Sequence, residues 1–173
     1  MIHKQTPLIL KTLEPKGVFW GYASTQTLDQ SGDQILPGAF SKTLKAWQVT
    51  KNRFPHLLWE HDAQEFIGVC LELREDPKGL YIKGKLLVDE IQKAQDAYTL
   101  LHHGIKGLSI GFRIRSAKKE ASKIRKILDL DLVEISFVQN PCNPEAVIHE
   151  FKTQDERNSD LVILDHLTTL LRR

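Results

Sequence analysis

The stretch KGLSIGFRI, residues 106–114, decides the fold expected for this chain. In and just after it, apolar residues alternate with small or basic ones: Leu108, Ile110, Phe112 and Ile114 against Ser109, Gly111, Arg113 and Arg115. Strict alternation predicts a strand with one face in the core, which leaves Ser109 on the opposite face. Gly107 and Gly111 remove side-chain bulk from that face, so another backbone or a substrate chain could approach Ser109 closely. This is the arrangement that an exposed nucleophile requires.

Residues 107–111 also match GxSxG, the nucleophile elbow of α/β-hydrolases. An elbow needs a sharp turn at the serine and a helix directly after it. Here the alternation continues through Phe112 to Arg115, so a strand is expected in place of that helix and the elbow interpretation fails. A serine between glycines can also be only a small residue at a crowded crossing. The case for catalysis therefore depends on partners elsewhere in the chain.

Composition restricts the class of protein. The chain has 173 residues, enough for one domain with its own core, and is 41% hydrophobic and 27% charged, which is ordinary for a soluble globular protein. A formal net charge of +2 argues against a nucleic-acid binder that works through overall charge. A basic cluster between residues 118 and 126 falls at an expected hairpin tip, where a solvated loop is the simpler interpretation.

Cysteine use and hydropathy indicate the compartment. Cys70 and Cys142 are far apart and provide no disulfide framework, which suits a reducing cytoplasm. The apolar run at residues 8–10 is too short for a signal peptide or a membrane span. We expect a protein that stays soluble where it is made and has no membrane partner.

The pattern along the chain predicts more strands than helices. The expected strands cover residues 17–23, 56–61, 65–74, 80–88, 106–115 and 124–138, and the expected helices cover 37–49 and 89–104, the second with Asp89 as its N-cap. Residues 24–36 are polar and rich in turn formers, so an exposed loop is expected there. With no βαβ rhythm and no repeat, the class is α+β and mainly antiparallel, a β-barrel or sandwich with two or three helices packed on it.

The domain organisation follows from a change of composition near residue 150. Residues 1–150 are expected to form the barrel domain. Residues 151–173 are expected to form a polar linker and a C-terminal amphipathic helix over 161–171. This tail is interpreted as a separate appendage.

Glu134 interrupts an apolar run at residues 130–138 and is the first candidate partner of Ser109. Simple alternation places Glu134 on one face with Leu130, Leu132, Ser136 and Val138, where solvent is scarce and a carboxylate needs a hydrogen-bonded partner. If the two strands around the basic tip pair as a hairpin, Glu134 and Ser109 lie in one neighbourhood. An ion pair of Glu134 with Arg113 or Arg115 is the alternative.

His61 is the second candidate, because it follows the apolar strand at residues 57–59 and functional side chains commonly lie at strand ends. A plain surface histidine is the alternative. His56, Glu60 and His61 could in principle ligate a metal, but no Cys or His pair has a recognised zinc spacing, so no metal is expected.

Four sequence blocks resemble a known family. They are GAF at 38–40 after DQILP, WEHD at 59–62 followed by IG at 67–68, GLSIGF at 107–112, and LVEISFV at 132–138 followed by NPCNPEA at 140–146. Their order and spacing over residues 17–148 are similar to those of the prohead (capsid maturation) proteases of tailed bacteriophages. That family resembles herpesvirus assemblin in fold, so the resemblance implies an assemblin-like β-barrel ringed by helices.

The resemblance also implies roles. Matched residue by residue, the family's serine nucleophile falls on Ser109, its histidine on His61 and its acid on Glu134. Assemblin proteases use a second histidine as third member, so Asp131 and His56 remain rivals of Glu134. No cofactor is implied.

The implied biology is that of a serine endopeptidase in host cytoplasm, inside the immature procapsid. Its implied substrates are the scaffolding portion of the major capsid protein and the protease itself, and a homo-oligomer, with a dimer as one option, is expected. A non-catalytic capsid-assembly or scaffold-binding module with the same fold is the alternative, and a metal-dependent hydrolase is a weaker third.

Overall fold

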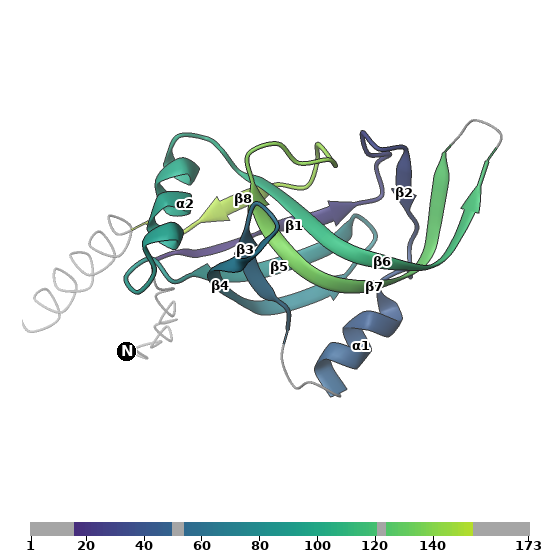
Figure 1. The fold of residues 1–173 in the computed structure, drawn as a ribbon, viewed down its shortest axis with the longest axis horizontal. Coiled ribbons are helices and arrows are strands. Elements are labelled where there is room, and N and C mark those ends of the chain that lie inside the picture. Colours follow the sequence, from purple (N-terminus) through teal and green to yellow (C-terminus); the bar gives the residue numbers. More distant parts are fainter. Residues whose placement is uncertain (1–15, 50–53, 121–123, 154–173) are drawn as a thin grey trace, which may run out of the picture. The chain divides into compact units, whose positions relative to one another are not determined.

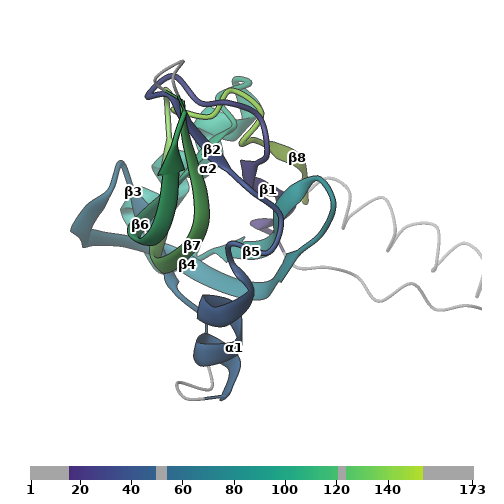
Figure 2. The same cartoon turned by 90° about the vertical axis from the view of Figure 1, so that its right-hand side faces the viewer.

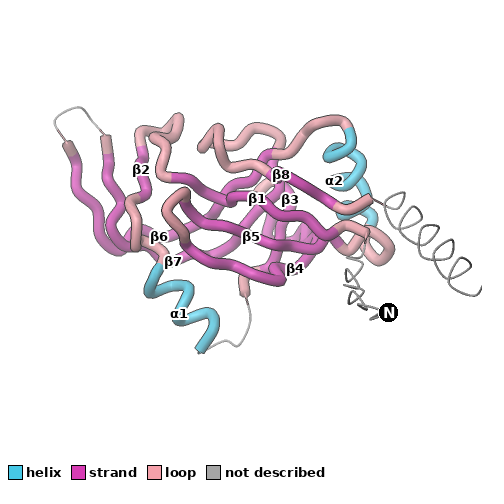
Figure 3. The backbone as a smooth tube through the Cα atoms, turned by 180° about the vertical axis from the view of Figure 1, so that it is seen from behind, coloured by secondary structure: helices cyan, strands magenta, loops and turns pink. Residues whose placement is uncertain are grey.

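The computed structural model describes residues 16–49, 54–120 and 124–153, and residues 17–151 form one compact unit (Figure 1). The elements in chain order are β1 (Val18–Thr25), β2 (Asp33–Ile35), α1 (Ser41–Val49), β3 (His56–Trp59), β4 (Asp62–Glu75), β5 (Gly79–Leu86), α2 (Gln92–His102), β6 (Gly107–Lys119), β7 (Arg125–Val138) and β8 (Ile148–Phe151). Strands dominate the tube in Figure 3, and the two helices lie apart from each other. The α+β class is confirmed.

The eight described strands form one sheet in the order β2-β7-β3-β4-β5-β1-β8, with β6 paired to β7. All pairs are antiparallel except β2–β7 and β3–β7, which are parallel. The sheet is not closed into a barrel, so the expected barrel is not confirmed. Its two ends approach where the Leu108 amide donates to the Ala146 carbonyl at 2.8 Å and the Ile148 amide to the Lys106 carbonyl at 2.8 Å. Beyond that point β6 pairs with β7 alone among the described strands.

The β6–β7 hairpin is the longest pairing and was predicted. Its register runs from Gly107 opposite Val138 to Lys119 opposite Arg125, and its tip at 121–123 lies outside the described residues. Figures 1 and 2 show these two green strands extending toward that tip, with β2 beside them there. On its other edge β7 pairs with β2 near its start and with β3 near its end. β7 is therefore paired on both of its edges near each of its ends.

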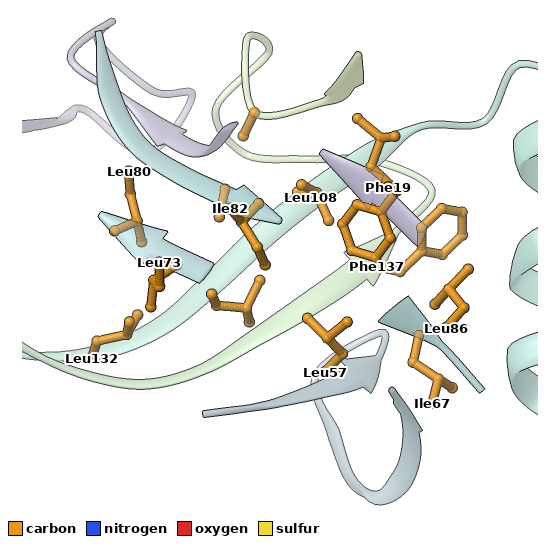
Figure 4. Close-up of a cluster of buried hydrophobic side chains, with 14 of the residues drawn as sticks. Phe19, Leu57, Ile67, Leu73, Leu80, Ile82, Leu86, Leu108, Leu132 and Phe137 are labelled. Carbon is orange, nitrogen blue, oxygen red and sulfur yellow. The ribbon is translucent and has the colours of Figure 1, made fainter. Parts of the chain in front are cut away.

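The core lies between the strands and is shown in Figure 4. Phe19 from β1, Leu57 from β3, Leu108 from β6 and Phe137 from β7 are each at most 2% exposed. Burying each such side chain contributes about 1.5–3 kcal/mol. The predicted alternation in β6 is confirmed where Ile110 and Phe112 pack against this core, but Ile114 is 38% exposed, although Leu130, which lies opposite it in β7, is fully buried.

Several element boundaries differ from the sequence expectations: α1 begins at Ser41 and not at 37, and the strand expected over 56–61 ends at Trp59. α2 begins at Gln92, with Ile91 at its N-cap and no side-chain cap bond, so the predicted Asp89 cap is wrong. The expected loop at 24–36 contains β2, which is joined to β7 because the carboxylate of Asp33 accepts two hydrogen bonds from Arg125, at 2.6 and 2.5 Å. β8 was not expected, and it forms by pairing with β1.

The expected linker and terminal helix fall almost wholly on residues 154–173, which lie outside the described residues. Among the described helices none is long and apolar enough to cross a membrane.

Candidate active site

A bulge in β7 decides which way Glu134 points. Gly111 pairs with Glu134 and Phe112 with Leu132, so Val133 is the extra residue of the bulged strand. Leu132 on one side of it and Ile135 on the other are both fully buried. The shared face predicted for Leu132 and Glu134 is therefore wrong, because the bulge resets the alternation and directs Glu134 to the face of Ser109.

Residues directly opposite each other in an antiparallel pair point to the same face. Ser109 lies opposite Ser136 and Gly111 opposite Glu134, so all four share a face. A Cβ added to Gly111 would lie only 2.3 Å from Oε1 of Glu134. The glycine was expected to admit a substrate chain, but the space over it holds the Glu134 carboxylate.

His61 lies in the two-residue turn between β3 and β4. Glu60 and His61 have φ of 46° and 63°, a left-handed conformation that non-glycine residues adopt at a cost of about 1–3 kcal/mol each. Hydrogen bonds to β7 and the residue after it hold the turn: the Glu60 amide donates to the Phe137 carbonyl at 3.0 Å, and Glu60 Oε1 accepts from the Gln139 amide at 2.8 Å. The local strain is therefore offset by tertiary contacts, as is common at functional sites.

Three side chains meet in a continuous hydrogen-bond chain. His61 Nδ1 lies 2.6 Å from Glu134 Oε1, and His61 Nε2 lies 3.0 Å from Ser109 Oγ. Because a carboxylate can only accept, Nδ1 carries the hydrogen of neutral His61 and Nε2 is left as the acceptor for the Ser109 hydroxyl. Ser109 and Glu134 come from the neighbouring strands β6 and β7, and His61 comes from the turn between β3 and β4.

Ser136 adds a fourth side chain to this network. Its side chain is fully buried, its hydroxyl donates to Glu134 Oε2 at 2.6 Å, and it accepts the His61 backbone amide at 3.2 Å. One hydroxyl thus fixes both the carboxylate and the backbone that carries the imidazole. The hydrogen bond to Glu134 raises the pKa of His61, helped by the negative charges of Glu134 and Glu60 and opposed by burial.

The rival residues have other partners. Asp131 accepts from Arg115 at 3.1 Å and from Thr43 at 3.3 Å, and the His56 ring packs edge-on against Phe66. Arg115, which was considered as an ion-pair partner of Glu134, thus pairs with Asp131. No group of three or more potential metal ligands occurs in the part of the chain that the structure describes.

The arrangement is that of a nucleophile, a base and an orienting acid, and the chemistry it can support is acyl transfer. A model of the Caudovirus prohead serine proteases matches residues 7–159. The chain belongs to this family. The predicted resemblance is therefore confirmed.

Relatives of this family member agree with the assignment. It is 34% identical over 139 residues to the prohead protease of Escherichia phage T5 and 36% identical over 148 residues to that of Enterobacteria phage HK97. These matches cover 78% and 81% of the chain but only 63% and 62% of the relatives, so the chain spans less than two thirds of their length. The capsid polyprotein of Pseudomonas phage PAJU2 is 32% identical over 149 residues, which are 82% of the chain and 21% of the polyprotein.

One solved structure supports the fold. The bacteriophage T4 capsid assembly protease superimposes with a TM-score of 0.61 at 11% identity, over 78% of this chain and 88% of that one. The varicella-zoster virus protease reaches a TM-score of 0.34, too low to support an assemblin-like fold.

Two cavities flank the site of this family member. One of about 540 Å³ is lined by His61, Glu134 and Gly111, together with apolar residues that include Trp47 and Phe54. The other, of about 170 Å³, is lined by Ser109 and not by His61. A cavity of about 850 Å³ beside α1 contains none of these site residues.

Ser136 and the role of Gly111 were missed by sequence reasoning. The spacing Glu-x-Ser at 134–136 was visible, since residues two apart in a strand share a face, and it pointed to a hydroxyl beside the acid. The crossing of Glu134 over Gly111 depends on the register and the bulge, which no local pattern reveals.

Proposed function

We propose that this chain is a serine endopeptidase of phage capsid maturation with Ser109, His61 and Glu134 as its catalytic triad. The observation that carries the proposal is the unbroken chain of contacts from Ser109 Oγ through both ring nitrogens of His61 to Glu134, at 3.0 and 2.6 Å. Membership of the prohead serine protease family supports the reaction class.

In this mechanism His61 Nε2 takes the hydroxyl proton as Ser109 Oγ attacks a peptide carbonyl, and returns it to the leaving amine. The C–N bond breaks, an acyl-serine remains, and water releases it by the same steps. Glu134 keeps His61 in the required tautomer and stabilises the imidazolium. The raised pKa of His61 makes it a stronger base than a free imidazole.

The oxyanion needs donors beside Ser109. Successive amides of a strand point to opposite edges, so the Ile110 amide faces the same edge as the Leu108 amide, which donates to Ala146. The Ile110 amide is therefore a candidate oxyanion donor.

The proposed substrates are the scaffolding portion of the major capsid protein and the protease itself, cut inside the immature procapsid in host cytoplasm. The names of the relatives, prohead protease and capsid polyprotein, support this assignment. We propose a homo-oligomer, with a dimer as one option, no cofactor, and an incompletely closed barrel of assemblin type. The bridge between Gly107 and Val147 supports the last point.

A fluorophosphonate probe tests the enzyme against the alternative of a non-catalytic capsid-assembly module. The enzyme predicts a label on Ser109 that disappears in Ser109→Ala but remains in Ser116→Ala, a matched change at an exposed serine of the same strand. Capsid protein should be cut by the wild-type chain and by Ser116→Ala, but not by Ser109→Ala. Absence of labelling and of cleavage by the wild-type chain in every oligomeric state would favour the binding module.

A further inference from the structure

The cavity of about 170 Å³ beside Ser109 lies along the edge of β6 and not over one face. Leu108, Ser109 and Ile110 all line it, although their side chains alternate between the faces of the strand. Residues from the 23–35 segment and from the loop that contains Asn143 form the opposite wall. A volume near 150 Å³ suffices to hold a benzene-sized molecule, so this cavity has room for one side chain.

The position of His61 decides which substrate residue this cavity receives. The imidazole must deliver its proton to the leaving amine, so the leaving segment lies on the His61 side of the nucleophile. His61 lines the 540 Å³ cavity and is absent from the lining of the 170 Å³ cavity, which Ser109 lines. The smaller cavity therefore belongs to the acyl side, next to the carbonyl that Ser109 attacks.

The lining suits a long side chain with a positive end. Ile35, Ile110 and Phe112 supply apolar surface, while Asp29 and Ser31 supply polar surface. A lysine or arginine has this division into an apolar stem and a cationic head.

Asp29 accepts hydrogen bonds from backbone amides only among the described residues, and the charge of nearby Arg125 also acts on it. Its Oδ1 accepts the amides of Ser31 and Asp33, each at 2.8 Å, and no hydrogen bond to Oδ2 occurs within residues 16–49, 54–120 and 124–153. Asp33, the other carboxylate of the lining, accepts hydrogen bonds from two guanidinium nitrogens of Arg125. Arg125 acts on Asp29 as well as on Asp33, and one cation against two carboxylates leaves a net negative charge at the lining.

We propose that this cavity binds the side chain of the residue preceding the scissile bond and selects lysine or arginine through Asp29. The proposal rests on the proposed function and adds a substrate class to it. A hydrogen-bonded charge pair of this kind changes kcat/KM by about 10- to 100-fold.

Peptides that differ only at this residue test the proposal. Lysine is compared with norleucine, which has the same stem without the charge, and with glutamate. The wild-type chain should cut the lysine peptide about 10- to 100-fold better than the norleucine peptide and leave the glutamate peptide almost uncut.

The matched variant is Asp29→Asn. An asparagine oxygen can still accept the two amides at Oδ1, so the turn is kept and only the charge is lost. The lysine preference, measured as the ratio of kcat/KM for the lysine peptide to kcat/KM for the norleucine peptide, should collapse. Asp96→Asn, the same change on α2 beside Lys93, is the control and should keep the preference.

The outcomes separate the two proposals. Cleavage of all peptides without a lysine preference, an unaltered preference in Asp29→Asn, or a preference at the residue following the bond overturns the cavity assignment alone. Cleavage by Ser109→Ala, or no labelling and no cleavage by the wild type, overturns the proposed function.

Discussion

The two halves of the β6–β7 hairpin have the same antiparallel pairing but different surroundings. In the half from Gly107 to Gly111, β7 is also paired with β3, and the facing residues form the hydrogen-bond chain around His61. In the half from Ile114 to Lys119 every residue of β6 is exposed, and cross-strand contacts include surface ion pairs such as Lys126–Glu120 just beyond it. A third strand is paired with β7 in both halves, β3 in the inner one and β2 in the outer one. The difference is the turn after β3, which carries the histidine.

The largest expected effect comes from the two reacting side chains. Ser109→Ala and His61→Ala should each lower kcat/KM by about 10⁴-fold or more, and the double variant should be hardly worse, because members of one catalytic unit act together. Steady-state cleavage with thermal melting as a folding control measures this. A His61→Ala protein that works nearly normally would remove His61 from the triad.

Glu134→Gln should cost less, about 100-fold or more, because an orienting acid contributes less than the nucleophile or base. The base works only when neutral, so activity is lost as the pH falls through the pKa of His61. Glu134 raises that pKa, so its loss should move the acid limb of kcat/KM to lower pH. An acid limb that stays in place or moves upward would contradict the assignment of the acid.

Gly111→Ala should damage the same interaction without touching a titratable group. The new Cβ would displace the Glu134 carboxylate, which is the flexible end of a side chain. The fold should therefore persist, with a change of about 1 kcal/mol or less in the free energy of unfolding. We expect a loss close to that of Glu134→Gln and the same shift of the acid limb. In a Glu134→Ala background the glycine substitution should have little further effect, and full additivity there would show that it acts by another route.

The smallest effect is expected in the outer half. Arg115→Ala removes a contact of 3.1 Å to Asp131 at a side chain that is 41% exposed. Exposed ion pairs contribute about 0–1 kcal/mol, so unfolding free energy should fall by no more than that, and cleavage should not change. Loss of cleavage in this variant would extend the functional region toward the tip.

Particular residues show which parts of the fold and of the site could be predicted from the sequence. The alternation around Ser109 and the turn-forming tip identified the hairpin, because both signals are local. The resemblance brought Ser109, His61 and Glu134 together as candidates, and in the structure these residues are in contact. The predicted orientation of Glu134 was wrong because one inserted residue, Val133, reverses the face to which every later side chain of the strand points.

The short edge strands were missed for a related reason. β2 and β8 are pinned by distant partners, through Asp33 with Arg125 and Ile148 with Gly21, and no local pattern specifies them. The terminal helix at 161–171 remains a prediction.

The left-handed turn at Glu60 and His61 has a consequence for biosynthesis. A ribosome releases the chain from its N-terminus, so Ser109 and His61 both emerge before residues 134–139. Until those residues arrive, the partners that hold the turn are absent: the Phe137 carbonyl, the Ser136 hydroxyl and the Gln139 amide. A nascent chain therefore carries the proposed nucleophile and base without the means to align them, and in the proposed mechanism cleavage has to wait until β7 has been translated and folded.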